Sequence, residues 1–182
     1  IGKIGKGNIK NLIAIKNAQF SSKETTIKAN KIDYDFINNI IDVKGKNIEM
    51  AFEKGSISSD RSLIFYNLDK KALVEGNVFI KINNKGNIKA EKVSVLIDQK
   101  GEVSSVKAIN NVEIFLDELE QNLFSDEAIF DNNASRIDLV GNIVLYYGES
   151  FLKGDRAYID LKKGISKISS DNKGNVSGSF VK

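Results

Sequence analysis

Short stretches in which hydrophobic and polar residues alternate recur along the whole chain, and polar turns separate them. The pattern is clearest where residues 139–147 are followed by a turn, by residues 152–161 and by a second turn at 162–164. Alternation at every second residue is typical of a β-strand with one buried face. No stretch of ordinary helix length shows a helical period. The pattern therefore predicts an all-β chain of roughly a dozen or more short strands.

The alternating stretches also form a repeat. Each unit opens on an apolar residue, runs through a small or polar pair and one or two charges into a strand, and then reaches a polar turn. In the second half of most units a Gly or Asn precedes a β-branched run, as at Gly76 and Gly141. The units begin near Ile27, Ile57, Ile88, Phe124 and Leu152, with spacings of 30, 31, 36 and 28 residues. Stacked units of this kind predict a single β-jellyroll or solenoid in which each unit extends one elongated core, with residues 1–182 forming one domain.

The overall composition is that of an ordinary globular chain. Hydrophobic residues make up 41% and charged residues 28% of the 182 positions, which is close to average usage. No apolar run approaches the roughly 18 residues that a membrane helix needs. The basic start at Lys3 and Lys6 is not followed by the apolar segment of a signal peptide. A leader or anchor removed ahead of Ile1 is compatible with this sequence.

The residues that the chain lacks narrow its chemistry. It contains no Cys, His, Trp or Pro, so neither a Ser-His-Asp nor a Cys-His relay can be built and the usual zinc ligands are missing. An enzyme would have to work with carboxylates, Lys, Tyr or a carboxylate-bound metal; one example is a carbohydrate-active β-solenoid that uses two carboxylates. Its candidate pairs lie in turns or recur as part of the repeat, where acids usually serve solubility and turn geometry; they are Asp126/Glu127, Asp117/Glu118 and Asp155/Asp160. We expect no enzymatic activity, no metal and no cofactor.

The charge is small but uneven. The net charge is +3, and five lysines (Lys3, Lys6, Lys10, Lys16 and Lys23) precede the first acid, Glu24. A basic stretch of this kind can meet an anionic partner, or its lysines can keep an exposed strand edge from aggregating. Nucleic-acid binding is not favoured, because the lysines are scattered and the five tyrosines form no stacking platform.

Several phrases in the second half of the chain carry a family resemblance. Residues 139–145 are followed by Gly154-Asp155-Arg156-Ala157, by Asp160-Leu161 and by Gly164, and residues 74–78 followed by 90–93 repeat the first half of this phrase. Residues 174–180 add a similar ending. Together these phrases resemble the LptA/OstA family, the periplasmic proteins of lipopolysaccharide transport. The resemblance covers about residues 57–180, and residues 1–56 add an extra unit.

The resemblance implies a fold, a ligand and a set of partners. The implied fold is an open β-jellyroll in the periplasm whose interior groove holds the acyl chains of lipid A. Head-to-tail stacking would then bridge the inner and outer membranes, with lipopolysaccharide as ligand and with the chain itself, LptC or LptD as protein partners. LptC and the N-terminal domain of LptD share the fold, and Tyr34-Asp35 would suit LptC, so the family member stays open. A purely structural β-repeat protein without a lipid ligand is the alternative, and it predicts a core packed shut.

Alternation selects the side chains that would line such a groove. Burying a methylene is worth about 0.8 kcal/mol, so an acyl chain of about a dozen carbons could contribute roughly 8–10 kcal/mol before ordering costs. The same residues could equally form a dry core. The candidate groove residues are Ile32, Tyr34, Phe36, Ile64, Val78, Ile80, Ile82, Val93, Val95, Ile97, Val112, Ile114, Leu116, Ile143, Leu145, Tyr147, Ala157, Ile159 and Leu161.

The two ends of the chain supply candidate partner edges. An exposed strand edge offers backbone donors and acceptors to a neighbouring chain. Because the two ends differ, such a contact is heterologous and can extend into a filament. We expect the contacts at Leu12, Ile13 and Ile15 on one side and at Val176 and Phe180 on the other.

Overall fold

The computed structural model describes residues 9–23, 25–170 and 175–179, and all regular structure in these residues is β. Fourteen strands form one antiparallel sheet, so the prediction of an all-β fold is confirmed. The strands are β1 (Asn11–Ser21), β2 (Thr25–Asp35), β3 (Ile40–Lys44), β4 (Ile48–Phe52), β5 (Gly55–Ser59), β6 (Ser62–Tyr66), β7 (Lys71–Ile82), β8 (Gly86–Ile97), β9 (Val103–Leu116), β10 (Gln121–Asp131), β11 (Arg136–Tyr147), β12 (Ser150–Asp160), β13 (Ile165–Ser169) and β14 (Ser177–Ser179).

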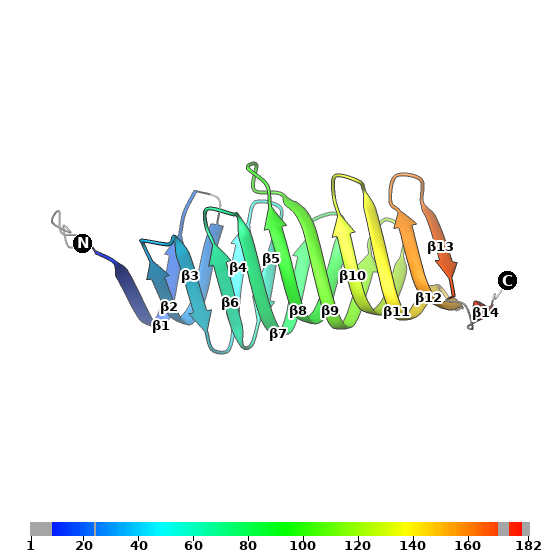
Figure 1. Ribbon diagram of the computed structural model, residues 1–182, viewed down its shortest axis with the longest axis horizontal. Helices are drawn as coiled ribbons and strands as arrows, with labels where there is room; N and C mark the ends of the chain where they lie inside the picture. The colour runs from blue at the N-terminus through cyan, green and yellow to red at the C-terminus, as the bar shows by residue number, and fades with distance from the viewer. Residues whose placement is uncertain (1–8, 24, 171–174, 180–182) are drawn as a thin grey trace.

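The sheet folds over on itself into two layers, one behind the other in Figure 1. Strand β7 shows how: its first half pairs with β6 in the front layer, and its second half pairs with β5 in the back layer. The other long strands cross between the layers in the same way, and the crossings lie along the lower edge in Figure 1. The result is an elongated, open β-jellyroll.

A pair of residues with left-handed backbone marks the corner where a strand crosses between the layers. In β7 the pair is Gly76 and Asn77, with φ of 91° and 42°, and in β11 it is Gly141 and Asn142, with φ of 79° and 47°. The strand register shifts at both places. Asn is among the few residues with a side chain that tolerate this conformation. The recurring Gly-Asn of the sequence is therefore the corner of the folded sheet.

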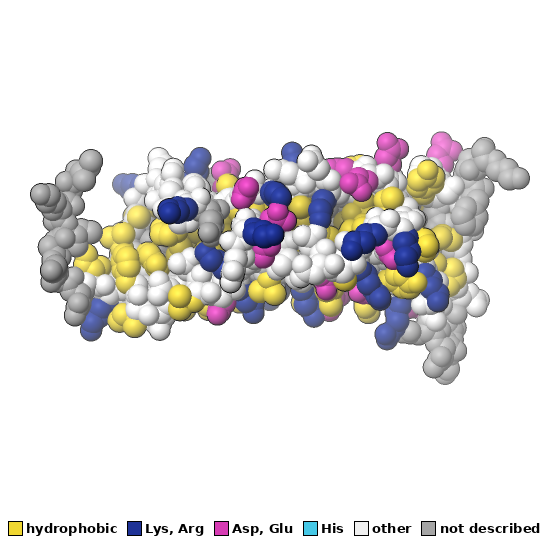
Figure 2. Space-filling view, turned by 90° about the horizontal axis from the view of Figure 1, so that it is seen from above, with side chains coloured by type: hydrophobic (Ala, Val, Ile, Leu, Met, Phe, Trp, Pro, Cys, Tyr) yellow, Lys and Arg dark blue, Asp and Glu magenta, His cyan; other side chains and the backbone are white. Residues whose placement is uncertain are grey.

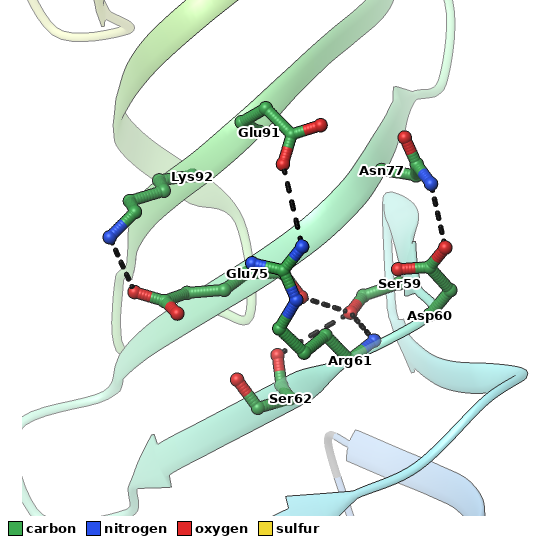
Figure 3. A network of polar contacts seen from close by, with 8 residues as sticks. All are labelled: Ser59, Asp60, Arg61, Ser62, Glu75, Asn77, Glu91 and Lys92. Carbon is green, nitrogen blue, oxygen red and sulfur yellow. Dashed lines mark hydrogen bonds and ion pairs between the residues drawn. The ribbon is translucent and has the colours of Figure 1, made fainter.

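Polar side chains fix the register at these corners, as Figure 3 shows for β5 to β8. The side-chain amide of Asn77 donates a hydrogen bond to the Asp60 carboxylate at 2.6 Å. The buried hydroxyl of Ser59 donates to the backbone carbonyl of Glu75 at 2.8 Å. The Ser59 bond joins β5 to β7, and the Asn77 bond joins β7 to the turn between β5 and β6, so a slip of one residue would break both.

The same bond recurs farther along the sheet, where Asn142 donates to Asp126 at 2.9 Å. Asp126 is one member of a candidate catalytic pair, and in the structure it serves as the acceptor of a corner. The same Asn–Asp hydrogen bond therefore stabilises a corner in each half of the sheet.

The predicted repeat corresponds to pairs of strands. Each unit starts within the first four residues of β2, β5, β8, β10 or β12. In the fourth unit Phe124 points outward, and Leu123 is the buried equivalent of Ile27, Ile57 and Ile88. The assignment of residues 1–182 to one domain stays a prediction.

Apolar side chains form continuous cross-strand rows on the inward face of each layer, and they belong to one hydrophobic cluster. The back row consists of successive pairing partners from β2 to β11, namely Ile27, Met50, Ile57, Ile80, Ile88, Ile114, Leu123 and Leu145. The front row from β3 to β12 consists of Ile41, Phe65, Ala72, Val95, Val106, Phe130, Ile137 and Ile159. The core therefore runs along the length of the molecule between the layers.

Candidate functional site at the open edge

The two layers meet again at the edge opposite the corners, and we call this edge the mouth. It consists of the front-layer turns at 36–39, 67–70, 98–102, 132–135 and 161–164 and the back-layer turns at 53–54, 83–85, 117–120 and 148–149. Figure 2 looks down on this edge, where hydrophobic side chains are visible between charged ones. The mouth is thus where the apolar interior comes nearest to solvent.

Side chains from opposite turns bridge the mouth, as Lys54 and Lys85 show. Lys54 of the back layer forms an ion pair with Glu102 of the front layer, and this hydrogen bond raises the pKa of Lys54. Lys85 donates a hydrogen bond to the Asn132 side chain, and its ammonium lies 5.6 Å from the centre of the Phe130 ring. These bridges are exposed polar contacts, which are individually weak.

Backbone hydrogen bonds at the turns run along each layer instead of across the mouth. In the back layer, Asp117 N–H donates to the carbonyl of Lys85 at 3.1 Å. In the front layer, Leu161 N–H donates to the carbonyl of Ser135 at 2.8 Å. Separation of the layers at the mouth would therefore leave these backbone bonds in place.

Aspartates organise the front-layer turns. The Asp160 carboxylate accepts hydrogen bonds from the backbone N–H groups of Lys163 and Lys162, at 3.0 and 3.1 Å. The bond from Lys163 is the main cause of a lowered pKa of Asp160. Asp35 accepts in the same way from Asn38, and its pKa is lowered as well. Asp160, which belongs to another candidate catalytic pair, is thus part of a turn.

A cavity of about 210 Å³ opens at the mouth between the β7–β8, β9–β10 and β12–β13 turns. Its deeper walls are apolar and come from both layers, with Ile82, Ile88, Ile114 and Leu116 from the back and Phe130 and Ile137 from the front. Its rim carries Lys85, Glu118, Leu119, Leu161 and Lys162. The cavity gives the apolar interior access to solvent.

Most of the sequence-predicted groove residues lie on the inward faces. Tyr34 and Leu161 are half-buried and pack against the core, and Ile82, Ile114, Leu116 and Leu161 also line the mouth cavity. Fourteen are at most 9% exposed: Ile32, Val78, Ile80, Ile82, Val93, Val95, Ile97, Val112, Ile114, Leu116, Ile143, Leu145, Ala157 and Ile159. Their contact with a lipid stays a prediction.

Three predicted groove residues lie elsewhere. Ile64 faces outward, because it stands between the buried Leu63 and Phe65 in β6. Phe36 and Tyr147 follow the inward alternation but lie at strand ends on the mouth, where they are 40% and 63% exposed. The prediction that Ile64 lies on the inward face is therefore wrong. Strand β6 is apolar on both sides, so its composition does not indicate which face is buried.

Sequence reasoning missed several cavity residues. Leu119 lies in the turn between β9 and β10, outside any alternating stretch, yet it forms part of the rim. Phe130 and Ile137 are buried in β10 and β11. The alternation of Ala128 with Phe130 is a signal that could have found the β10 member, since both are buried.

Both ends of the sheet expose strand edges. Within the described residues β1 pairs with β2 alone, and its Leu12, Ile13 and Ile15 are exposed, Ile15 by 67%. At the other end β13 and β14 both pair with β12. Val176 is exposed there, whereas Phe180 lies outside the described residues. A role of these edges in partner binding stays a prediction.

Aromatic rings fill the interior at the β1 end. Phe20 and Tyr34 meet edge to face with ring centres 5.4 Å apart, and Phe36 stacks on Tyr34 at 4.4 Å. The Tyr34 hydroxyl is 3.1 Å from the Asn39 side-chain oxygen, to which it donates a hydrogen bond. Aromatic rings from β1, from β2 and from the turn after β2 therefore cluster at this end of the sheet.

Two further properties of the described residues bear on the kind of site. In the described part of the chain, no helix is long and apolar enough to cross a membrane. Among the same residues, no group of three or more His, Cys, Asp or Glu side chains is placed to hold a metal ion.

The fold and its apolar interior define a class of protein, the elongated β-jellyroll built from repeated strand pairs. The family model described as LptA/(LptD N-terminal domain) LPS transport protein matches residues 56–165. The chain therefore belongs to this family of lipopolysaccharide transport proteins, and the resemblance found in its sequence is confirmed.

Solved structures give the same fold. LptH from Pseudomonas aeruginosa, described as the LptA homologous periplasmic component of the conserved lipopolysaccharide transport device, is similar with a TM-score of 0.60 and 11% sequence identity. The match covers 69% of this chain and 94% of LptH. At this identity the likeness establishes the fold alone. A comparison with curated proteins found no match.

Proposed function

We propose that the chain is a periplasmic, non-enzymatic transport component that shields the acyl chains of lipid A between its two layers. The observation that carries this proposal is the inward apolar rows, which run from β2 to β12 and reach solvent at the mouth cavity. Membership of a lipopolysaccharide transport family gives the ligand class. LptH, described as a periplasmic component, supports the compartment.

The energetics suit a lipid and need no cofactor. Each methylene transferred from water contributes about 0.8 kcal/mol, so a chain of about a dozen carbons contributes roughly 8–10 kcal/mol before ordering costs. Opening the mouth sacrifices the exposed bridges from Lys54 and Lys85, while strand pairing within each layer is kept. Acyl chains would replace contacts between the facing rows with equally apolar contacts.

We further propose that the jellyroll stacks end to end with copies of itself or with the LptC and LptD members of the same machine. The exposed edge of β1 at one end and those of β13 and β14 at the other support this arrangement. The two edges differ, so pairing between them is heterologous and leaves a free edge for the next jellyroll.

A second candidate is a structural β-repeat protein with no lipid ligand. The close packing of the inward rows favours it, since protein side chains alone bury their members. The two candidates differ in one respect that can be measured, which is whether the interior accepts an acyl chain.

Native mass spectrometry of the delipidated protein with purified lipid A tests the proposal. We expect a lipid A adduct that Leu161→Asp, at the half-buried rim, abolishes. The matched control Ile129→Asp, on the outward face of β10, should keep the adduct. Absence of any adduct from the folded protein at micromolar lipid would exclude the transport role and favour the structural repeat.

A further inference from the structure

The mouth cavity is too small for a whole multi-chain lipid. Its volume of about 210 Å³ is below the roughly 300–1,000 Å³ of pockets that enclose a drug-sized ligand. Most of its lining residues are apolar, and Leu119 from the back layer and Leu161 from the front layer are among them. A cavity of this size and lining fits the end of one hydrocarbon chain.

The rim of this cavity carries an excess of positive charge. Its lining residues include the exposed Lys85 and Lys162 and one carboxylate, Glu118. Among the described residues no carboxylate forms an ion pair with either lysine, and the partner of Lys85 is the neutral Asn132 side chain. Several other lysines do form ion pairs with carboxylates, namely Lys54, Lys89, Lys92, Lys107 and Lys163.

A cationic rim above an apolar cavity matches an amphiphile with an anionic head. The ammonium of Lys85 has three donors, of which the bond to Asn132 uses one, so it can bind a phosphate oxygen without losing that bond. Lysine recognises phosphate as a point charge, without a fixed fork geometry. Two lysines on one rim can therefore hold a phosphate whose attached chain points inward.

We propose that the mouth cavity is the site where one acyl chain of a phosphorylated lipid enters between the layers, with its phosphate held by Lys85 and Lys162. This inference rests on the proposed transport function and assigns the head-group contact of that function to two residues. Leu119 and Leu161 form the apolar gate through which the chain passes.

Calorimetric titration with single-chain probes tests the assignment below their micelle concentrations. Dodecyl phosphate should bind the wild type more tightly than dodecyl maltoside does. The double variant Lys85→Gln with Lys162→Gln should bind dodecyl phosphate about tenfold more weakly than the wild type. Binding of dodecyl maltoside should stay the same. The control pair Lys81→Gln with Lys100→Gln has the same net charge, lies off the cavity, and should change affinity by less than about twofold.

Three results would overturn the assignment. One is an equal loss of affinity for dodecyl phosphate in the two double variants, which would show that net charge alone causes the loss. Another is unchanged affinity of the Lys85/Lys162 variant for dodecyl phosphate while its melting temperature equals that of the wild type. The third is binding of inorganic phosphate as tight as that of dodecyl phosphate, which would show an anion site without an acyl chain.

The two proposals fail separately. If lipid A binds but the Lys85/Lys162 variant binds it and dodecyl phosphate like the wild type, the head-group assignment is wrong and the transport role stands. If lipid A does not bind but dodecyl phosphate binds with the expected lysine dependence, the cavity assignment stands and the transport role is wrong.

Discussion

At the scale of single residues, the fold depends on a few positions where the chain must leave ordinary strand geometry. The Gly-Asn corners combine left-handed backbone with close approach of a neighbouring strand. A Cβ placed on Gly76 would lie 2.5 Å from an oxygen of Asp60. The corner thus requires Gly for space and tolerates Asn beside it for its conformation.

The geometry of the corner predicts unequal losses of unfolding free energy for two glycine substitutions. Both Gly141 and Gly148 have positive φ, at 79° and 57°, so Gly148→Ala should lose about 1 kcal/mol of unfolding free energy through backbone strain alone. No atom lies within 4 Å of a Cβ at Gly148, whereas one at Gly141 would lie 3.0 Å from the Asp126 Cβ. Gly141→Ala should therefore lose about 2–3 kcal/mol in urea unfolding. Equal losses would contradict the role of the corner.

The aspartate of the β12–β13 turn predicts a pH-dependent effect. The pKa of Asp160 is lowered from 3.8 chiefly by the backbone hydrogen bond from Lys163. A lowered pKa contributes stability above the unfolded value, and this contribution is lost as pH falls through the folded value. Asp160→Asn should thus lower the melting temperature at neutral pH, and the difference should shrink between about pH 5 and about pH 2. A difference that does not depend on pH would contradict the charge-based account.

At the scale of strands, alternation assigns each side chain to one face of the sheet, and a stability comparison can check that assignment. Ile80→Ala deletes part of the buried back row and should cost about 2–5 kcal/mol. Ile64→Ala removes an outward side chain of β6 and should cost less than about 1 kcal/mol. Chemical unfolding of the two variants measures both losses. A larger loss of stability in Ile64→Ala than in Ile80→Ala would contradict this assignment of faces.

The exposed edge strands predict association between molecules. Ile13→Asp on β1 and Ile165→Asp on β13 place charges at opposite ends of the sheet, on side chains that are exposed. Each should abolish concentration-dependent growth of the particle mass in X-ray scattering, while a mixture of the two variants should stop at pairs formed through their intact ends. Association that both charges leave unchanged would contradict stacking through these edges.

The sequence predicts the strands better than it predicts the site. Polar turns and strict alternation locate the β-strands and their inward residues, as the buried Val93, Val95 and Ile97 of β8 illustrate. Alternation does not indicate which face of the sheet Ile64 occupies, because its strand is apolar on both faces. The cavity was not predictable either, since it depends on which turns of the two layers face each other. Residues as distant in sequence as Ile82 and Leu161 meet there.

At the scale of the whole molecule, continuous strands close one edge of the folded sheet, and turns joined by side-chain contacts form the other. Corners with polar register bonds hold the layers together along one side, and exposed side-chain bridges hold them at the mouth. This asymmetry suits the proposed transport role, in which a lipid enters between the layers while strand pairing is kept. It also places the interior rows parallel to the axis along which copies would stack.

Photo-crosslinking to lipid A tests the central claim most directly, because it locates the lipid relative to the two faces of the sheet. A benzophenone side chain would replace Leu119 or Leu161 at the mouth, and Ile64 or Ile129 on the outward face. The account predicts lipid A crosslinks from the two mouth positions and none from the two outward positions. Crosslinks of equal yield from Ile64 and Ile129, or none from the mouth in a folded protein, would contradict it.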